Sequence, residues 1–364
     1  MWISEYIDLL ASLIVGITFL FSGVVKLNDP RGFAYKIEEY LHLFASRLAT
    51  HLRLLIPYTV ILSVSIATLE AVLGVALLVH WQRFWTLSAL LSLTFFFTCL
   101  TLYTATSKRV ASCGCFGDAL ALTPWQSFAK SSVLLVLLIG LYWQEKGERA
   151  SPNDYYWLAF TLLCSLGMGR RTLRHLPWQD FLPYKIGSDL SQLVRPHLPL
   201  RYMYTVKKEG QTIETEHYPQ APGCKLISTR LLNPEDVPTA MHFSIWQGVK
   251  DRTQDLLTGC KLLIIAQNST PIAPRSLQKL HILIRQIQNQ KRVQPVLVAS
   301  SNHGQEVAAT LTLPLYTANP LLLRTMLRAP LGLFFLQEGT VVNKFHLNDL
   351  RQAQNTLKQL GWSC

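Results

Sequence analysis

Five long apolar runs occupy the first half of the chain and constrain its fold more than any other feature. They extend over Tyr6 to Val25, Leu54 to Val79, Phe84 to Thr106, Phe128 to Trp143 and Tyr155 to Met168. A helix needs about 20 consecutive apolar residues to cross the hydrocarbon core of a bilayer. The first three runs reach that length and the last two are shorter, so we expect a membrane bundle of four or five helices.

The first apolar run is expected to be retained as a membrane span. The chain opens Met1-Trp2-Ile3-Ser4-Glu5-Tyr6-Ile7-Asp8, which lacks the basic region of a secretory signal peptide, and no small-residue cleavage site follows the run. Aromatic residues near the ends of the runs, such as Trp81, Trp125 and Trp143, are typical of the belts that membrane helices place at the interfaces.

The basic charge of the chain is concentrated in its second half. Residues 1–169 hold 11 Lys and Arg against 10 Asp and Glu, and residues 170–364 hold 23 against 12, so nearly all of the net charge of +12 lies there. A basic domain beside a bilayer is attracted to anionic lipid headgroups. The basic residues are scattered and no nucleic-acid-binding motif is present, so we expect membrane lipid, and not nucleic acid, as a partner.

The second half is expected to be soluble and to mix strands with helices. A proline-containing connector over residues 170–200 separates a membrane domain at 1–169 from an α/β domain at 201–364. The patterns predict strands at 201–206, 212–218, 242–246, 261–266, 295–299, 331–336 and 341–345, and helices at 274–288, 304–311 and 348–360. A βαβ unit followed by a ββα unit is the order of thioredoxin-like domains.

Two cysteines flank a glycine in the loop Ser112-Cys113-Gly114-Cys115-Phe116-Gly117-Asp118, between two apolar runs. A disulfide between Cys113 and Cys115 would close a small, strained ring that is easily reduced. Lys108 and Arg109 nearby would favour the thiolate form. The pair is a candidate for a cycling disulfide, and the alternatives are a structural bridge, two free thiols, or half of a metal site. No second Cys-x-x-Cys or His pair supplies further ligands, so we expect no metal.

The other five cysteines have weaker roles in this interpretation. Cys99 and Cys164 lie within predicted helices and are expected to be packing residues. Cys224, Cys260 and Cys364 are candidate partners for each other or for the Cys113 loop, and an odd total of seven leaves at least one cysteine unpaired.

Glu70 lies within the second apolar run, where an ionisable group is costly and marks a functional candidate. We expect either a role in proton or charge movement coupled to thiol oxidation, or a structural hydrogen bond to a neighbouring helix. Lys26 and Asp29, at the end of the first run, are expected to anchor a helix end at the membrane interface.

The number of crossings predicts which segments share a membrane face. With five spans, the loop after the first helix, the Cys113 loop and everything beyond Gly169 lie on one face, whatever the orientation of the bundle. Basic residues gathered on that face favour the cytoplasm by the positive-inside rule. Cycling disulfides belong mainly to oxidising compartments, so the cysteine pair favours the periplasmic face of a bacterial inner membrane, which we adopt.

A set of motifs is spread over residues 1–145. It comprises Gly16-Ile17-Thr18-Phe19-Leu20-Phe21-Ser22-Gly23-Val24-Val25-Lys26-Leu27-Asn28-Asp29-Pro30, Glu39-Tyr40-Leu41, Leu69-Glu70 with Gly74, Cys113-Gly114-Cys115-Phe116-Gly117-Asp118 and Thr123-Pro124-Trp125. With these motifs the segment resembles the DoxX-like, methylamine-utilisation MauE family of bacterial membrane proteins. The resemblance implies a four-helix module similar in layout to the vitamin K epoxide reductase bundle. It also implies a role in disulfide formation or in maturation of an exported partner, such as the methylamine dehydrogenase small subunit.

The long second half departs from the minimal family, and the whole architecture is similar to DoxX-family proteins of Bacteroidetes, in which a thioredoxin-like domain follows the membrane module. Thioredoxin chemistry needs Cys-x-x-Cys at the start of the helix after the first central strand, but residues 267–274 contain no cysteine. Ala329 and Pro330 precede a strand, where the fold keeps a cis-proline, and they predict a peptide-binding edge without dithiol chemistry.

These features predict a membrane thiol-disulfide oxidoreductase or maturation factor. Cys113 and Cys115 would exchange electrons with the thiols of an exported or membrane protein, and a membrane quinone or another redox protein would accept them. Two other classes compete with this hypothesis. One is a non-catalytic membrane scaffold with a structural Cys-x-Cys bridge, and the other is a small-solute transporter, against which the absence of internal repeats counts.

Overall fold

The computed structural model divides the chain into two compact units, Met1–Phe181 and Leu182–Cys364, and each is described by itself. It describes residues 2–46, 49–107, 114–120, 122–145, 154–194, 201–208, 211–216, 225–233, 243–267, 274–290, 292–300 and 304–359. Cys113, Lys108, Arg109, Cys224 and Cys364 therefore lie outside the described residues.

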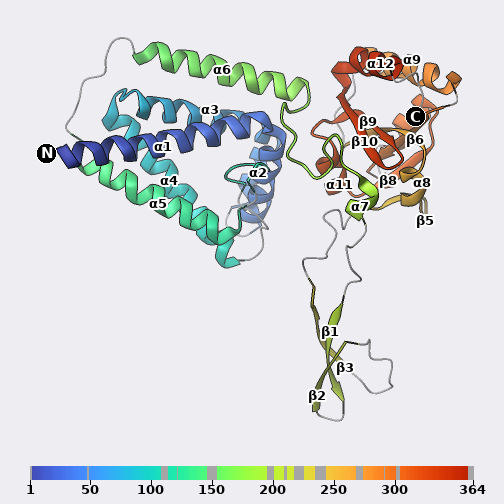
Figure 1. Ribbon diagram of the computed structural model, residues 1–364, viewed down its shortest axis with the longest axis horizontal. Helices are drawn as coiled ribbons and strands as arrows, with labels where there is room; N and C mark the ends of the chain where they lie inside the picture. The colour runs from blue at the N-terminus through green and yellow to red at the C-terminus, as the bar shows by residue number, and fades with distance from the viewer. Residues whose placement is uncertain are drawn as a thin grey trace. The chain divides into compact units, whose positions relative to one another are not determined.

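Unit 1 is a helical bundle. Its elements are α1 (Trp2–Asn28), α2 (Pro30–Ala45), the 3₁₀ segment η1 (Thr50–Tyr58), α3 (Thr59–Leu78), α4 (Arg83–Ser107), α5 (Pro124–Trp143) and α6 (Asp154–Arg174) (Figure 1). Four helical segments of the described chain are long and apolar enough to cross a membrane: Glu5–Asn28, Thr50–Leu78, Arg83–Ser107 and Pro124–Trp143. They correspond to the first four apolar runs, so the predicted membrane bundle is confirmed for four spans.

Helices α1 and α3 approach closely because glycines lie between them. A Cβ atom on Gly23 would lie 2.6 Å from the Ala67 carbonyl oxygen, and one on Gly74 would lie 2.7 Å from the Gly16 carbonyl oxygen. Membrane helices are not driven together by the hydrophobic effect, so small residues that let backbones touch are a main source of their association. This contact places residues of α1 directly against residues of α3.

Helix α2 is not one of the predicted elements, because the segment is too polar to be recognised as a span. Pro30 begins the helix, and the Asp29 carboxylate accepts a hydrogen bond of 2.9 Å from the Gly32 backbone N–H. Proline at the first position and aspartate at the cap both favour a helix start. Asp29 is therefore a helix cap and does not form an interfacial anchor with Lys26.

Helix α6 forms on the fifth apolar run and packs along α1 and α3 (Figure 1). Near its C-terminal end, the Thr172 hydroxyl donates a hydrogen bond of 2.8 Å to the carbonyl oxygen of Leu27, at the end of α1. The Asn28 side chain, at the end of α1, donates a hydrogen bond of 2.7 Å to the carbonyl oxygen of Gln179, which lies just beyond α6. The outward side chains of α6 are mostly large and apolar: Tyr155, Tyr156, Trp157, Phe160, Leu162, Leu163 and Leu166 are exposed. The helix ends beside the end of α1.

Unit 2 contains a seven-stranded mixed sheet in the order β10-β9-β6-β7-β8-β4-β5. The strands are β4 (Ile245–Gln247), β5 (Lys250–Asp251), β6 (Cys260–Ala266), β7 (Gln294–Ala299), β8 (Leu315–Ala318), β9 (Leu331–Gln337) and β10 (Thr340–His346). Strands β6, β7 and β8 are parallel, and β9, β10, β4 and β5 join by antiparallel pairs. The predicted strands at 261–266, 295–299, 331–336 and 341–345 are confirmed, whereas β8 was not predicted.

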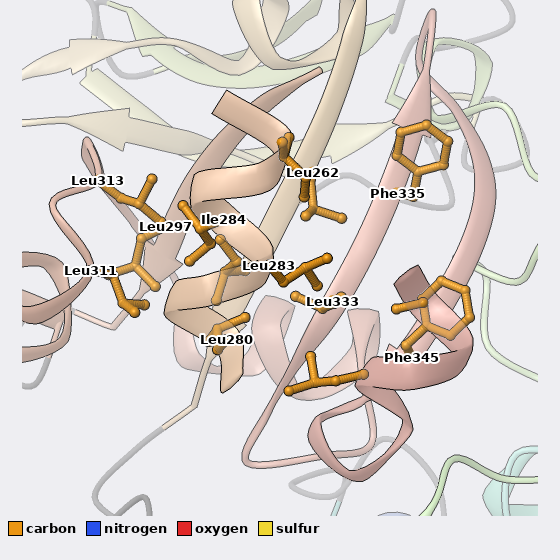
Figure 2. Close-up of a cluster of buried hydrophobic side chains, with 14 of the residues drawn as sticks. Leu262, Leu280, Leu283, Ile284, Leu297, Leu311, Leu313, Leu333, Phe335 and Phe345 are labelled. Carbon is orange, nitrogen blue, oxygen red and sulfur yellow. The ribbon is translucent and has the colours of Figure 1, made fainter. Parts of the chain in front are cut away.

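The helices of unit 2 are α7 (Leu190–Val194), α8 (Thr253–Leu257), α9 (Pro274–Gln290), α10 (Gly304–Leu311), α11 (Pro320–Met326), the short 3₁₀ turn η3 (Leu347–Asp349) and α12 (Leu350–Gln359). Figure 2 shows the core that α9 forms with the sheet. Leu280, Leu283, Ile284 and Ile287 recur at helical spacing on α9 and are buried against Leu262, Leu297 and Leu333 of the strands.

A separate three-stranded sheet has the order β2-β1-β3. Strands β1 (Tyr202–Lys208) and β2 (Gln211–Thr215) form the predicted hairpin, and β3 (Lys225–Leu231) pairs with the other edge of β1. The sequence pattern did not predict β3.

Tyr184 carries a pH dependence of stability in unit 2. Its ring lies 5.8 Å from the Phe243 ring, and burial raises the pKa of its hydroxyl from 10.0 to about 12. Because the folded state holds this proton more tightly, the stabilisation is complete below the unfolded pKa and is lost as the pH rises from about 10 to about 12. Tyr184→Phe is expected to flatten this part of the curve, which denaturant unfolding at several alkaline pH values would measure. An equally steep curve in the variant would contradict the assignment.

Candidate functional site

A cavity of about 190 Å³ lies inside unit 1. Side chains of α1 to α5 line it together with Gly114 and Cys115 of the cysteine loop. Most of the lining is apolar and aromatic, and the polar exceptions include Ser22, Lys26, Lys36, Glu70, Thr94 and Lys130. Ligand sites in proteins commonly combine apolar walls with a few placed polar groups, so this cavity is the candidate functional site.

Lys26 and Glu70 form a buried ion pair in the cavity wall. The Lys26 ammonium lies 2.6 Å and 2.7 Å from the two carboxylate oxygens of Glu70, and the side chains are 3% and 1% exposed. Lys26 Nζ also lies 4.9 Å from the ring centroid of Phe33 and 5.2 Å from that of Phe97. The interpretation of Lys26 as an interfacial anchor is therefore wrong, because its ammonium turns inward to the carboxylate on α3.

Ser22 connects this ion pair to the cysteine loop. Its hydroxyl oxygen lies 2.8 Å from a carboxylate oxygen of Glu70 and 2.9 Å from the Cys115 carbonyl oxygen. One hydroxyl carries a single hydrogen, so Ser22 donates fully to only one of these two acceptors at a time. The hydroxyl therefore couples the position of the Glu70 carboxylate on α3 to that of the Cys115 backbone.

Cys115 is half-buried and lines the cavity, as expected for one member of the predicted pair. The other member, Cys113, lies outside the described residues, as do Lys108 and Arg109. Two lysines that were not predicted lie beside the loop instead. Lys36 Cγ would be 3.2 Å from a Cβ atom on Gly114, and Lys130 Nζ lies 4.1 Å from the Phe116 ring centroid. Nearby positive charge favours a cysteine thiolate.

Several residues of the cavity were not predicted as site residues, and only two of them could have been recognised from the sequence. Lys26 and Lys130 are charged residues next to or inside apolar helices, and an ionisable group in such a place marks a functional candidate. Ser22, Thr94 and Lys36 carried no such signal, since serine and threonine are common in membrane helices and Lys36 lies on a polar helix. Only the packing of the bundle brings these side chains to one cavity.

The proline edge of unit 2 differs from its prediction. No cis peptide bond occurs among the described residues, so Pro330 follows Ala329 through a trans peptide and the expected cis-proline is wrong. Trans is the lower-energy form even before proline. The Gln267 backbone N–H donates to the Pro330 carbonyl oxygen at 2.7 Å, and the Gln267 side chain donates to the Leu323 carbonyl oxygen at 2.7 Å. Ala329 is fully buried, and the predicted peptide-binding role of this edge stays a prediction.

The remaining described cysteines fall into two groups. Cys260, at the start of β6, is disulfide-bonded. Cys99 on α4 and Cys164 on α6 are free and exposed on the outside of the bundle, so they are not the packing residues that we expected. Within the described ranges, no three His, Cys, Asp or Glu side chains gather as metal ligands would.

The four apolar helices, with a charged pair enclosed among them, define the class of this chain as a helical membrane protein that also carries a strand-rich C-terminal unit. Residues 4–144 match the family model described as methylamine utilisation protein MauE. The match covers α1 to α5 and the cysteine loop, so this part of the chain is similar to that family, as its motifs predicted. No curated protein and no solved structure matches the chain.

Proposed function

We propose that the protein is a membrane thiol-disulfide oxidoreductase that acts in the maturation of an exported or membrane partner. The observation that carries the proposal is the position of Cys115 in the wall of a cavity that also holds the Lys26–Glu70 pair. A purely structural loop would need neither a cavity beside Cys115 nor lysines against its neighbours Gly114 and Phe116. By resemblance to the family, the partner would be of the methylamine dehydrogenase type.

The reaction proceeds in two balanced steps. A thiolate of the partner attacks one sulfur of the Cys113–Cys115 disulfide and forms a mixed disulfide, and a second partner thiolate displaces the chain's cysteine. The partner is then oxidised, and Cys113 and Cys115 are reduced. The reduced pair passes two electrons and two protons to a membrane quinone, which becomes a hydroquinone, and the disulfide is restored.

Unit 2 would present the partner. We assign it a thioredoxin-like fold, supported by the neighbours β7-β6-β9-β10, by the parallel pair β6 and β7 joined through α9, and by α12 after the last hairpin. The position of the thioredoxin dithiol falls at residues 267–274, which contain no cysteine. This unit therefore binds a peptide or docks on a partner, while the dithiol chemistry belongs to the cysteine loop.

The proposal places unit 2 and the cysteine loop on the same face of the membrane. Ser22 on α1 contacts Cys115, and further along α1 Leu27 contacts Thr172 at the end of α6, so α6 ends at the bundle end that carries the cysteine loop. At the opposite end, Arg83 pairs with Asp8 and with Glu145, which follows α5. Helix α6 is not among the four described helices that are long and apolar enough to cross a membrane, and we assign it the fifth crossing because it leads back to the end of α1. The disulfide at Cys260 favours an oxidising compartment, hence the periplasmic side of a bacterial inner membrane.

The test is to trap the cysteines in cells by rapid acid quenching and alkylation, followed by mass spectrometry. We expect Cys113 and Cys115 in a mixture of oxidised and reduced forms, and Cys115→Ser should accumulate mixed disulfides between Cys113 and a partner. Cys164→Ser, which alters an exposed thiol on α6, is the matched control and should trap nothing. If Cys113 and Cys115 are fully oxidised, and their replacement changes only the stability of the protein, the result would instead support a non-catalytic membrane scaffold with a structural bridge.

A further inference from the structure

Helices α9 and α12 lie side by side on one face of the large sheet in unit 2 (Figure 1). The Gln354 side chain of α12 donates a hydrogen bond of 2.8 Å to the side-chain oxygen of Gln286 on α9. Ile284 of α9 and Leu357 of α12 belong to the same buried core, so these sides of the two helices face the sheet. Their opposite sides carry exposed side chains and form one continuous outer layer.

The exposed charges of this outer layer are all positive. They are Arg275, Lys279 and Arg285 on α9, and Arg351 and Lys358 on α12. Neither helix contains an Asp or Glu residue. In the part of the chain that the structure describes, none of the five forms an ion pair with a carboxylate. Exposed helices often offset their cations with carboxylates three or four residues away, so these five make an unusual surface of one sign, which we call the basic helix face.

Charges elsewhere in unit 2 are offset by opposite charges. Arg201 pairs with Glu216 at 2.8 Å, and Arg252 pairs with Asp255 at 2.7 Å. Asp255 lies on α8, which follows the edge strand β5, whereas α12 packs against β10 at the other edge of the sheet. This uneven distribution of charge gives unit 2 a preferred side toward an anionic surface.

Ile282 indicates which anionic partner fits the basic helix face. Its side chain is 57% exposed on the outer side of α9, three residues from Lys279 and three from Arg285. Basic residues around an exposed apolar side chain are typical of helices that lie in the membrane interface. The four apolar helices of the same chain keep a bilayer within reach, so individually weak contacts act at a high effective concentration. An acidic protein would match the charges but has no acyl region for Ile282 to enter.

We propose that the basic helix face docks on a bilayer that contains anionic lipids. Arg275, Lys279 and Arg285 bind the headgroup phosphates, and Ile282 enters the boundary between headgroups and acyl chains. Each well-placed Lys or Arg strengthens binding to an anionic membrane about fivefold. The inference is independent of the proposed function, because no cysteine takes part in it.

The experiment uses the full-length protein in nanodiscs of phosphatidylcholine, so that the bilayer around its membrane helices is neutral and leaves the basic helix face available. Sedimentation measures binding to separate vesicles, made either of phosphatidylcholine alone or of an equal mixture with phosphatidylglycerol. We expect binding to the anionic vesicles and none to the neutral ones. Binding should be lost in about 1 M NaCl, where the screening length is only about 3 Å.

A triple variant, Arg275→Gln with Lys279→Gln and Arg285→Gln, should weaken binding to the anionic vesicles about a hundredfold, or about fivefold for each charge. The matched control removes three exposed cations from other parts of unit 2, and it should leave binding nearly unchanged: Lys185→Gln, Arg230→Gln and Lys250→Gln. All six side chains are exposed, so both variants should keep the stability of the parent protein.

Two further measurements separate a bilayer from other anionic partners. Ile282→Ser should weaken binding to the anionic vesicles about tenfold, because an apolar side chain no longer leaves water. Equal losses in the two triple variants would overturn the inference, since the attraction would then follow net charge and not the basic helix face. Polyglutamate is the probe for an acidic protein. If it bound through Arg275, Lys279 and Arg285 while the anionic vesicles did not bind, or if Ile282→Ser lost no affinity for the vesicles, docking on a bilayer would be refuted.

Discussion

Glu70→Ala is expected to lower the free energy of unfolding of unit 1 by about 3–5 kcal/mol, the range found when one partner of a buried ion pair is removed. The variant leaves the Lys26 ammonium, which is 3% exposed, without its counter-charge. It also removes one acceptor of the Ser22 hydroxyl. Unfolding of the purified protein in mixed micelles, followed by far-ultraviolet circular dichroism, would measure the change.

The matched control replaces both charges by apolar side chains of similar length. Lys26→Met combined with Glu70→Met removes the ion pair without leaving a buried charge, and such replacements are often neutral or stabilising. We expect the double variant to recover most of the stability that Glu70→Ala loses. A loss below about 1 kcal/mol in the single variant would mean that Lys26 reaches water when its partner is absent, and the pair would not be enclosed.

The double variant also tests whether Glu70 has a role beyond stability. A protein that folds normally without the pair still lacks the carboxylate next to Ser22 and Cys115, so its cysteine pair should be reoxidised more slowly if Glu70 takes up or supplies a proton. Unchanged reoxidation in a stable double variant would leave Glu70 with the structural hydrogen bond that was its alternative interpretation.

The sequence predicted the carboxylate but not its partner, and the reason lies in tertiary packing. Glu70 is conspicuous because it interrupts an apolar run, whereas Lys26 lies near the end of its run, where a lysine normally reaches the interface. Which way Lys26 turns depends on the close contact of α1 with α3, and this contact joins residues 44 positions apart. Thr94 was equally invisible, because only the packing of the bundle places it in the cavity wall.

The strands of unit 2 were predicted where burial is continuous and missed where it is not. β6 and β9 are buried along almost their full length, and their sequences are accordingly apolar except for Lys261 and Gln337. β8 spans only four residues, most of them half-buried, so its composition differs little from that of a loop. Strand β3 carries several polar residues and gave no alternating pattern. Short or half-buried strands are defined by their hydrogen-bond partners more than by their own side chains.

Among the Gly→Ala substitutions in α1, Gly23→Ala is expected to disrupt the bundle most. The new Cβ would lie 2.6 Å from the Ala67 carbonyl oxygen and 2.7 Å from the Ala71 backbone nitrogen. Backbone atoms cannot move aside as a flexible side chain does, so the two helices must separate. Overpacking typically costs 1–3 kcal/mol, and we expect about 3 kcal/mol here. Separation of α1 from α3 would also lengthen the Lys26–Glu70 ion pair and open the cavity.

Gly140→Ala is the matched control, because it adds the same methyl group to a helix at a position where, apart from the chain neighbours and backbone of α5 itself, no atom lies within 4 Å. It should stabilise α5 slightly, by about 0.5–1 kcal/mol, through the higher helix propensity of alanine. Unfolding in mixed micelles should therefore show a loss of stability in Gly23→Ala and no loss in Gly140→Ala. If both glycine variants were equally stable, the close contact of α1 with α3 would not exist, and the ion pair, the Ser22 link and the cavity that depend on it would lose their structural basis.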